Sequence, residues 1–330
     1  MWRGLAGGWG VGHGTLMNDQ ATRSGEGALA GAGLRVVVTG TGGRLGGAVA
    51  RRLRQWGHRV VAWDRKALDL TVPEQIDDHF GGARYDVVVN CAAATLLDWC
   101  EDHPEEAWQV NAEAARRMAE HCVAQGARLI HVSTDYVYDG RLPGLREEAD
   151  PVEPLGVYAA TKAEGERVVL ASGADAVVVR VSWVFGPDRP AFPDQMLRQA
   201  LRGEFCAAVA DKWSVPTYSH DLADMIGWLL VQPRISGVLN LCSEGSCSWQ
   251  EYGQATLDLA AELGLPLKVR HVEPLTLAAM KSFRAVRPVW TAMSTRRMRS
   301  LGFTPRPWRE ALGEYLRTYY AGAVDLPEEI

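Results

Sequence analysis

The sequence predicts an α/β fold, in which a doubly wound parallel sheet is joined to a smaller mixed α/β lobe. Short β-branched runs alternate with segments of helical periodicity over residues 34–186, which favours parallel strands covered by helices on both faces. A glycine-rich turn joins the first run to the first helical pattern. Beyond residue 186, loops, short strands and helices mix, which indicates a second lobe packed against the sheet.

Five apolar runs are the expected strands of the sheet: LRVVVTG, HRVVAWD, YDVVVNCAA, ARLIHVSTDYVY and ADAVVVRVSWVFG. Ligands of such sheets bind beyond the carboxyl ends of the strands, so the residues that follow each run are candidates for a site. In the second half, SGVLNLCSEGSCSWQEYGQATLDLAAELG predicts a strand, a loop and a helix. Ser248 and Glu251 stand there in the order of a capping box.

Composition and charge narrow the classes of function. The 330 residues carry a net charge of −5 without a long run of one sign, which gives no basis for nucleic-acid binding. No stretch has the length of apolar sequence that a membrane-spanning helix needs. The six cysteines form no CxxC pair and no histidine cluster accompanies them, so we predict no metal site and reduced thiols in the cytoplasm.

Residues 1–33 differ from the rest of the chain, because they are rich in glycine and lack a usable period. They also lack the basic start and continuous apolar core of a signal peptide. We therefore predict a disordered leader, or a start assigned too early with Met17 as the true start, and keep this segment outside the fold.

The glycine-rich turn TGTGGRLG follows the first expected strand and opens the first helix. Glycine tolerates unusual dihedrals and lets the backbone approach a pyrophosphate, while the helix N-terminus offers unpaired N–H groups. Asp64 ends the next strand, where a ribose-binding carboxylate is typical. The alternative is a turn whose glycines serve packing only. We predict a dinucleotide site formed by Gly40, Gly43, Arg44, Leu45 and Gly46.

The choice of cofactor stays open between NAD and NADP, with a slight preference for NADPH. Asp64 suits the ribose hydroxyls of NAD, whereas the adjacent Arg65 suits the 2′-phosphate of NADP. Asp69 and Leu70, in ALDLT, are candidates for the edge of the adenine site, and the equal alternative is a loop aspartate and a core leucine. Residues 34–186 are thus mainly a dinucleotide-binding domain, and residues 187–330 mainly a substrate-binding lobe.

The candidate catalytic group is Thr134, at a strand end, with Tyr158 and Lys162 one helical turn apart in VYAATKAEGERVV. A free phenol has a pKa of about 10, too high for efficient proton transfer near neutrality. A neighbouring ammonium stabilises the phenolate, so we predict that Lys162 lowers the pKa of Tyr158 and also binds the nicotinamide ribose. The alternative is a surface pair. Gly165 interrupts the helix and is expected to let it pack closely on a neighbour.

These motifs resemble those of the extended short-chain dehydrogenases/reductases, which have a Rossmann-type fold, and more narrowly the dTDP-4-dehydrorhamnose reductase group of sugar-nucleotide reductases. The resemblance covers about residues 34–316. The motifs specific to the narrower group are STDYVYDG and SWVFG. Others are ALDLT, VVVNCAA, HPEEAWQVN, PVEPLGVYAATKAEGE, VPTYSHDLADMI and RPVWTAMSTRRMRSLG.

The resemblance implies reduction of the 4-keto group of a nucleotide-linked deoxysugar by NAD(P)H, with Thr134, Tyr158 and Lys162 carrying the proton chemistry. It implies that the cofactor passes Asn90, Cys91, Ala92 and Ala93, and that Asn111 steadies the backbone of the active site. The implied substrate contacts are Asp135, Tyr136, Trp183 and Arg287. Simple core filling is the alternative for Trp183. A homodimer is also considered.

Departures from the family pattern keep other functions open. A bulky apolar pair stands in AATLLDWCE, beside the expected sugar site, which leaves a natural sugar other than rhamnose open. An epimerase or dehydratase of the same fold is one alternative, although a dehydratase would want an acidic pair near Thr134. A non-catalytic NADP-binding regulatory subunit is the other, and the regulatory subunit of methionine adenosyltransferase is such a relative. The intact Thr134, Tyr158 and Lys162 favour an enzyme.

Overall fold

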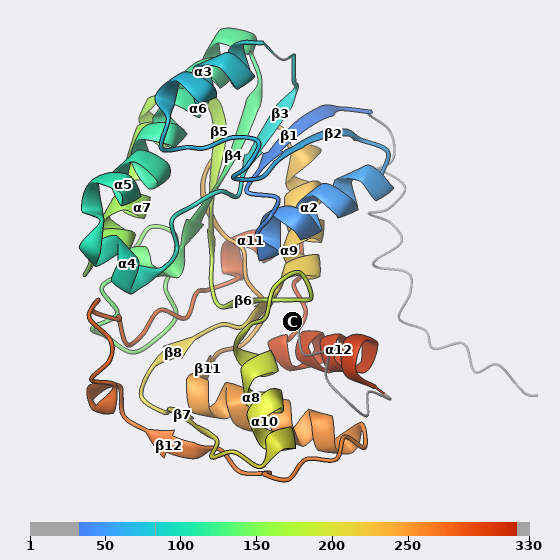
Figure 1. Cartoon of the computed structure of the whole chain (residues 1–330). Helices are drawn as coiled ribbons and strands as arrows, with labels where there is room; N and C mark the ends of the chain where they lie inside the picture. The colour runs from blue at the N-terminus through green and yellow to red at the C-terminus, as the bar shows by residue number, and fades with distance from the viewer. Residues whose placement is uncertain (1–32, 83, 322–330) are drawn as a thin grey trace, which may run out of the picture.

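The computed structural model describes residues 33–82 and 84–321. The leader or early start predicted for residues 1–33 falls outside these ranges, apart from Gly33. Figure 1 shows a large domain built on a sheet, with a smaller lobe below it. Within the described residues, no helix combines the length and apolar character that crossing a bilayer requires. The same residues contain no group of three or more His, Cys, Asp or Glu side chains suited to a metal ion.

Six parallel strands form the sheet of the large domain, in the order β10-β5-β4-β3-β1-β2. Their bounds are β1 Arg35–Thr39, β2 Arg59–Trp63, β3 Val87–Asn90, β4 Arg128–Thr134, β5 Asp175–Val181 and β10 Gly237–Asn240. The central strands are valine-rich because helices cover both faces and bury them. The predicted doubly wound α/β fold is confirmed.

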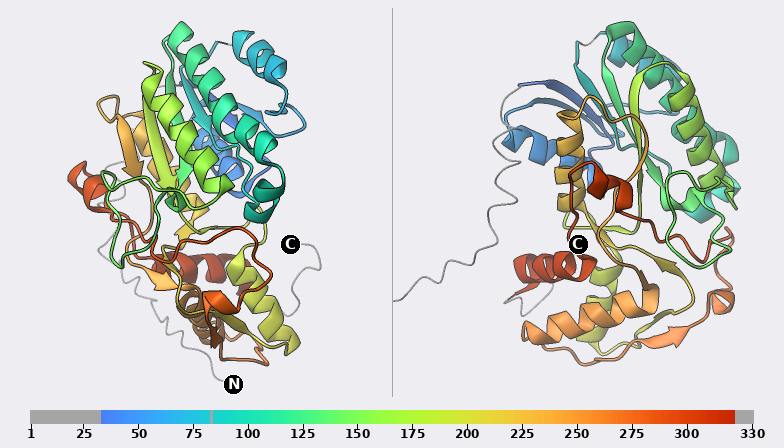
Figure 2. Two further views of the ribbon diagram at one scale, coloured as in Figure 1. Left: turned by 90° about the vertical axis from the view of Figure 1, so that its left-hand side faces the viewer. Right: turned by 180° about the vertical axis from the view of Figure 1, so that it is seen from behind.

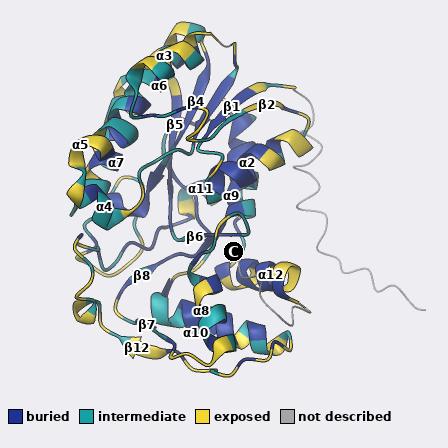
Figure 3. Ribbon diagram, viewed as in Figure 1, coloured by how far each residue is buried: buried dark blue, intermediate teal, exposed yellow. Residues whose placement is uncertain are grey.

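Helices cover the two faces of the sheet in separate layers (Figures 1 and 2). One layer comprises α3 Pro73–Gly81, α4 Leu97–Asp102, α5 Pro104–Trp108, the π-helical turn η1 Gln109–Glu113, α6 Ala114–Gln125 and α7 Val157–Ala171. The other comprises α2 Arg44–Gln55, α9 Ser219–Leu230 and α11 Arg296–Ser300. Figure 3 shows the buried residues gathered on the strands and on the helix faces turned to them.

The smaller lobe has an aromatic-rich core between three helices, α8 Phe192–Arg202, α10 Trp249–Glu262 and α12 Trp308–Tyr320. Its short strands are β6 Val184–Phe185, β7 Ala207–Val209, β8 Trp213–Ser214, β9 Thr217–Tyr218, β11 Cys247–Ser248 and β12 Glu273–Leu275. Two 3₁₀ turns, η2 Asp135–Val137 and η3 Leu277–Ala279, complete the elements. The capping box is present, because Ser248 Oγ accepts from the Glu251 N–H at 3.1 Å and the Glu251 carboxylate accepts from the Ser248 N–H at 2.9 Å.

The chain passes between the two units more than once, so position 186 is not a clean boundary. β10 adds to the sheet beside β5, and α9 packs against α2, although both come from the second half of the sequence. The last expected strand is also divided, since β5 ends at Val181 and β6 pairs with β9. The division into a mainly dinucleotide-binding and a mainly substrate-binding part therefore stays a proposal.

Gly165 lies where α7 meets η1. A Cβ there would lie well inside van der Waals distance of the Asn111 carbonyl oxygen, which explains the glycine in mid-helix. We expect Gly165→Ala to lower the free energy of unfolding by about 1–3 kcal/mol, the usual cost of overpacking, despite the better helix propensity of alanine. Urea unfolding measures this. Gly313→Ala in α12 is the matched control, because the nearest neighbour of the added Cβ would lie 3.8 Å away. This variant should be slightly more stable than the parent protein. Equal effects of the two substitutions on the free energy of unfolding would contradict the packing argument.

Candidate active site

The glycine turn brings the carboxyl ends of β1 and β3 together. Gly40 has φ of +69°, and a Cβ on it would lie 2.7 Å from the Cα of Ala92. A Cβ on Gly46 would collide with the carbonyl of Gly40. The first turn of α2 has no side-chain cap and no acidic residue, so its N–H groups are free to meet an anion. The turn therefore fits a dinucleotide pyrophosphate, at the point where the strand order reverses.

Arg44 and Leu45 differ from the expected cofactor contacts, because their side chains point elsewhere. The Arg44 guanidinium donates to the carbonyls of Val184 at 3.0 Å and Arg189 at 3.1 Å, which ties the turn to the loop after β6. Leu45 belongs to the core under α2. Only the backbone of these two residues is available to a phosphate at the helix N-terminus.

The residues after β2 form a short ordered turn. Asp64 Oδ1 accepts from the N–H groups of Lys66 at 3.0 Å and Ala67 at 2.9 Å, and Arg65 is exposed beside it. Leu70 is buried in the core against α3 and the sheet, so the core alternative holds for its side chain. Asp69 accepts from the N–H and hydroxyl of Thr71, and these hydrogen bonds lower the pKa of Asp69.

The end of β3 is steadied by two buried asparagines. Asn90 accepts from the Thr39 hydroxyl at 2.7 Å and from the Ala92 N–H at 3.2 Å. Asn111, in η1, accepts from the Ala94 N–H at 2.9 Å and donates to the Ala94 carbonyl at 3.1 Å. The segment that contains Cys91, Ala92 and Ala93 is therefore fixed directly opposite the glycine turn. Burial raises the pKa of the Cys91 thiol to about 12, so it is inert.

The structure brings the three predicted catalytic residues together. Thr134 ends β4, and its hydroxyl is hydrogen-bonded to Tyr158 in the first turn of α7. Lys162, one turn along α7, is 1% exposed and donates to the Val132 carbonyl at 2.7 Å. It also lies near enough to Cys91 to interact with it electrostatically, which places the amine beside the cofactor crevice. The alternative of a surface pair is wrong.

The predicted tuning of Tyr158 by Lys162 is wrong in this geometry. Burial raises the pKa of Tyr158, and the hydrogen bond to Thr134 only partly offsets that rise. Burial lowers the pKa of Lys162 to about 8, although Glu166 favours its charged form. The reason is that the amine is held at the backbone of β4, so the partner of the phenol is Thr134.

Asp135 occupies a different place from the expected sugar contact. Its carboxylate is buried and accepts from the hydroxyls of Ser214 at 2.7 Å, Thr291 at 2.6 Å and Thr134 at 3.2 Å. These bonds connect the end of β4 with β8 and with the segment between η3 and α11. Asp135 therefore positions Thr134 relative to the small lobe, while Tyr136 faces Tyr158 edge-on, with ring centroids 6.1 Å apart.

Trp183 has a strained backbone, a ring that stacks on two other aromatic rings, and an indole N–H without an acceptor. It is the one described non-glycine residue with positive φ, at 35°. Its ring stacks on Trp249 at 5.6 Å and on Tyr252 at 6.3 Å between centroids. Its indole N–H is buried without an acceptor. A backbone held in a sparsely populated region and an orphaned donor both favour a binding role over core filling alone.

A narrow cleft adjoins Tyr158, the candidate proton donor. Tyr136 and Tyr158 line it from the large domain, α4 contributes Leu97 and Glu101, and the remaining walls come from residues 155–159 and 285–288. It has only about 10 Å³ of space that the centre of a water-sized molecule can occupy. Arg287 flanks this cleft and pairs with Asp98 of α4 at 3.2 Å, so its guanidinium has a protein partner.

The sequence of the whole described chain matches one protein family, that of the RmlD substrate binding domain, over residues 34–321. The chain belongs to this family. A dTDP-4-dehydrorhamnose reductase of Mycobacterium tuberculosis (strain H37Rv) is 38% identical over 299 residues, covering 87% of this chain and 94% of that protein. The spore coat polysaccharide biosynthesis protein SpsK of Bacillus subtilis is 33% identical over 283 residues, covering 86% and 97%.

Solved structures of RmlD relatives share the fold of the chain. The dTDP-4-dehydrorhamnose reductase of Bacillus anthracis in complex with NADP superposes with a TM-score of 0.81, at 30% identity over 87% of this chain and all of that one. The Thermus thermophilus UDP-glucose 4-epimerase, in complex with NAD, has a TM-score of 0.75 at 21% identity, a likeness in fold.

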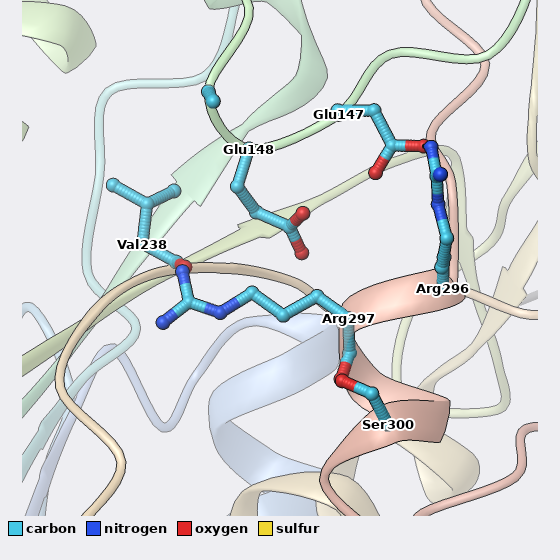
Figure 4. Close-up of a pocket in the computed structure, with 7 residues that line it drawn as sticks. Glu147, Glu148, Val238, Arg296, Arg297 and Ser300 are labelled. Atoms are coloured by element: carbon cyan, nitrogen blue, oxygen red, sulfur yellow. The ribbon is translucent and has the colours of Figure 1, made fainter.

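This RmlD-family chain has a second hollow, drawn in Figure 4, that lies apart from the catalytic residues. It adjoins the edge strand β10 and is lined by charged side chains that already have partners. Arg296 pairs with Glu147, Arg297 donates to the Ser236 carbonyl at 3.2 Å, and Glu148 accepts from the Asn240 N–H at 2.9 Å. None of the predicted site residues lines it, so the hollow is not the active site.

Lys212 is a site residue that sequence reasoning missed in this RmlD-family chain. It is fully buried, donates to the Pro288 carbonyl at 2.5 Å, and places its amine 4.6 Å from the centre of the Tyr136 ring. Asp98, Ser214 and Thr291 were also missed. Only Lys212 itself, in the otherwise largely apolar stretch VADKWSVPT, hints at the first of these, because the partners of all four lie far away in the sequence.

Proposed function

We propose that the chain is an NAD(P)H-dependent reductase of the 4-keto group of a nucleotide-linked deoxysugar. The observation that carries the proposal is the hydrogen-bonded Thr134 and Tyr158 pair, set beside a buried Lys162 and the glycine crevice. The named functions of its relatives support the same reaction, since they include dTDP-4-dehydrorhamnose reductases at 32–38% identity.

The residues suggest a simple division of labour. A bound reduced nicotinamide supplies the hydride, since no side chain can donate one. Thr134 holds the ketone oxygen by its hydroxyl, and Tyr158 gives its proton to that oxygen, so the carbonyl becomes a secondary alcohol. Lys162, whose amine donates to the backbone of β4, would bind the nicotinamide ribose with its remaining N–H groups.

The cofactor would be held by the turn of Gly40, Gly43 and Gly46, with Asp64 and Arg65 at the adenosine ribose. NADPH is slightly favoured, because one carboxylate oxygen of Asp64 already accepts hydrogen bonds from the backbone of its own turn, while Arg65 is exposed. Relative affinities for NADPH and NADH, measured by nicotinamide fluorescence, decide between them. If NADH binds much more tightly, the preference is wrong.

We also propose a cytoplasmic location and a homodimer. All six cysteines are free and five of them are buried, which suits a reducing compartment. The state of assembly is tested by light scattering of the purified chain. A monomer across the working range of concentration would contradict the dimer.

The deciding experiment mixes the protein with NADPH and a dTDP-linked 4-keto-6-deoxysugar and follows loss of the reduced-nicotinamide band. Decay with formation of the alcohol supports the reductase. Interconversion of sugars without net cofactor consumption supports an epimerase. Retained NADPH binding without decay, across a panel of nucleotide-linked keto sugars, supports the regulatory subunit and overturns the proposal.

The rate should fall at alkaline pH, with a midpoint near the lowered pKa of Lys162, which is about 8. Below that pH the amine is charged, which strengthens its hydrogen bonds to the nicotinamide ribose; above it that charge is lost. The pH profile of kcat measures this. Lys212→Met is the control, because burial also lowers the pKa of Lys212 to about 8. The fall in rate at alkaline pH should persist in this variant. If the fall vanishes, it is caused by Lys212 and not by Lys162.

A further inference from the structure

We propose that Glu101 of α4 is a positioning residue for Tyr158, because its carboxylate holds the first turn of α7 and so sets where the phenol meets the ketone. This inference rests on the proposed function for the reaction that the phenol serves. Tyr158 is the second residue of α7, which begins at Val157. Its hydroxyl is bonded to Thr134 on β4, so a small shift of this helix end moves the proton relative to a ketone held at Thr134.

The N-terminus of α7 has no capping side chain of its own. Its N-cap residue is Gly156, and its first turn contains no acidic residue. The N–H groups of a first helical turn have no acceptor within the helix. Glu101 supplies an acceptor from another element, because its Oε1 accepts from the Val157 N–H at 2.9 Å. A carboxylate at this point also interacts favourably with the positive end of the helix dipole.

Gly156 makes room for this carboxylate. Its backbone is extended, with φ of −155°, a conformation that any residue adopts. A Cβ at this position would lie 2.7 Å from Glu101 Oε1, so the glycine serves the close approach of the carboxylate and not a special dihedral angle. A side chain at position 156 would push the carboxylate away from the helix end. The two residues therefore act as a pair.

α4, which carries Glu101, is fixed on two sides. It packs against α7 (Figure 1). Asp98, one turn before Glu101, lies on the same face of α4. Its Oδ1 accepts from the backbone N–H groups of Arg284 at 3.1 Å and Ala285 at 2.9 Å. α4 thus connects two walls of the cleft, and Glu101 is its link to the wall that carries the phenol.

The second turn of α7 is fixed by other residues. Thr161 accepts from the Asn111 side chain at 3.0 Å. Lys162 donates to the Val132 carbonyl at 2.7 Å. Loss of the Glu101 carboxylate should therefore release the first turn of α7, while the rest of the helix and the glycine turn on β1 keep their places.

The test compares Glu101→Ala with Glu101→Gln in the reduction of a dTDP-linked 4-keto-6-deoxysugar by NADPH. Alanine should lower kcat about ten- to a hundredfold, since misplacing a reacting group by about 1 Å costs up to about 10²-fold in rate. NADPH affinity should stay within about twofold. Glutamine keeps an oxygen for the Val157 N–H, so its kcat should stay within about threefold of the parent. Asp102→Ala is the matched control, because this neighbour in α4 pairs with Arg284 at the surface, and its kcat should also stay close to the parent.

Two double variants show whether Glu101 acts through the phenol. Gly156→Ser in the Glu101→Ala background places a preferred N-cap side chain at the helix end, in the space that the carboxylate has left, and should restore much of kcat. Glu101→Ala added to Tyr158→Phe should lower kcat no further, because the proton that the carboxylate positions is already absent.

Hydrogen exchange at the amides of the first turn of α7 gives a measurement without turnover. In the NADP-loaded protein this exchange should be faster in Glu101→Ala than in the parent and close to the parent in Glu101→Gln. Unchanged exchange in Glu101→Ala overturns the inference. A loss of kcat in Glu101→Gln as large as in Glu101→Ala also overturns it, because the oxygen that accepts from the Val157 N–H is then not what matters.

The inference also fails if the effects of Glu101→Ala and Tyr158→Phe on kcat multiply, which would assign the carboxylate a direct contact with the sugar. If exchange rises as expected but the parent protein reduces no keto sugar, the proposed function fails. The inference then stands, because it concerns the place of Tyr158 on α7.

Discussion

Replacing Tyr158 with phenylalanine is expected to lower kcat for ketone reduction about 10²–10⁴-fold, the usual contribution of a positioned general acid. The phenol is the group that Thr134 holds at the end of β4, and phenylalanine keeps the ring while removing its proton. NADPH affinity should stay within about twofold, because the pyrophosphate turn lies on β1 and α2. Steady-state kinetics and nicotinamide fluorescence measure the two quantities.

The neighbouring tyrosine supplies the matched control. Tyr136→Phe keeps the ring that faces both Tyr158 and the Lys212 amine, and it removes a hydroxyl whose ionisation burial disfavours. We expect a much smaller loss of kcat in this variant. Equal losses in the two variants would show that the cleft tolerates neither change and would remove the assignment of Tyr158 as the acid.

The second large effect is expected at the buried ion pair of Glu166 and Arg180, which are 5% and 2% exposed. The guanidinium donates to both carboxylate oxygens, at 2.9 and 2.6 Å, and Ser133 donates to the same carboxylate at 2.5 Å. Glu166→Gln leaves Arg180 charged and without its anion. The free energy of unfolding should fall by about 3–5 kcal/mol, the usual cost of breaking a buried pair.

Removing both charges separates this cost from simple loss of packing. The double variant Glu166→Gln, Arg180→Met should recover much of the stability, since the buried guanidinium is removed together with the carboxylate that it pairs with. Urea unfolding of the two variants measures the difference. If the double variant is as unstable as Glu166→Gln alone, the effect comes from the shape of the network around Tyr138, which also contacts Arg180 at 2.7 Å.

Local sequence was enough to place the strands and the nucleotide turn. Runs such as RVVVT and VVVN have few alternatives to buried parallel strands, and Gly40 and Gly46 lie where a Cβ would clash. The spacing of Tyr158 and Lys162 is likewise fixed by the helical repeat. The resemblance to a family then added residues with no local signal, such as Trp183, whose strained backbone and unpaired indole N–H fit a binding role.

The sequence did not show which polar side chains are buried or which residues distant along the chain they contact. The sequence shows Lys162 beside Tyr158, and only the fold shows that its amine turns to the Val132 carbonyl, so the expected effect on the phenol was wrong. Asp135 looked like a substrate contact because it follows Thr134, yet hydroxyls 79 and 156 residues away satisfy it. In the same way β10 joined the sheet from the second half of the chain.

The sequence by itself determined the α/β fold and the glycine turn and pointed to the candidate proton-transfer residues, because the patterns that indicate them lie within single strands, turns or helices. The tertiary structure alone decided the charges and partners of those residues: the buried amine of Lys212, the pair of Asp98 with Arg287, and the pKa directions at Tyr158 and Lys162. The physical reason is that solvation and electrostatic interactions depend on distances in space, which the order of residues along the chain does not contain.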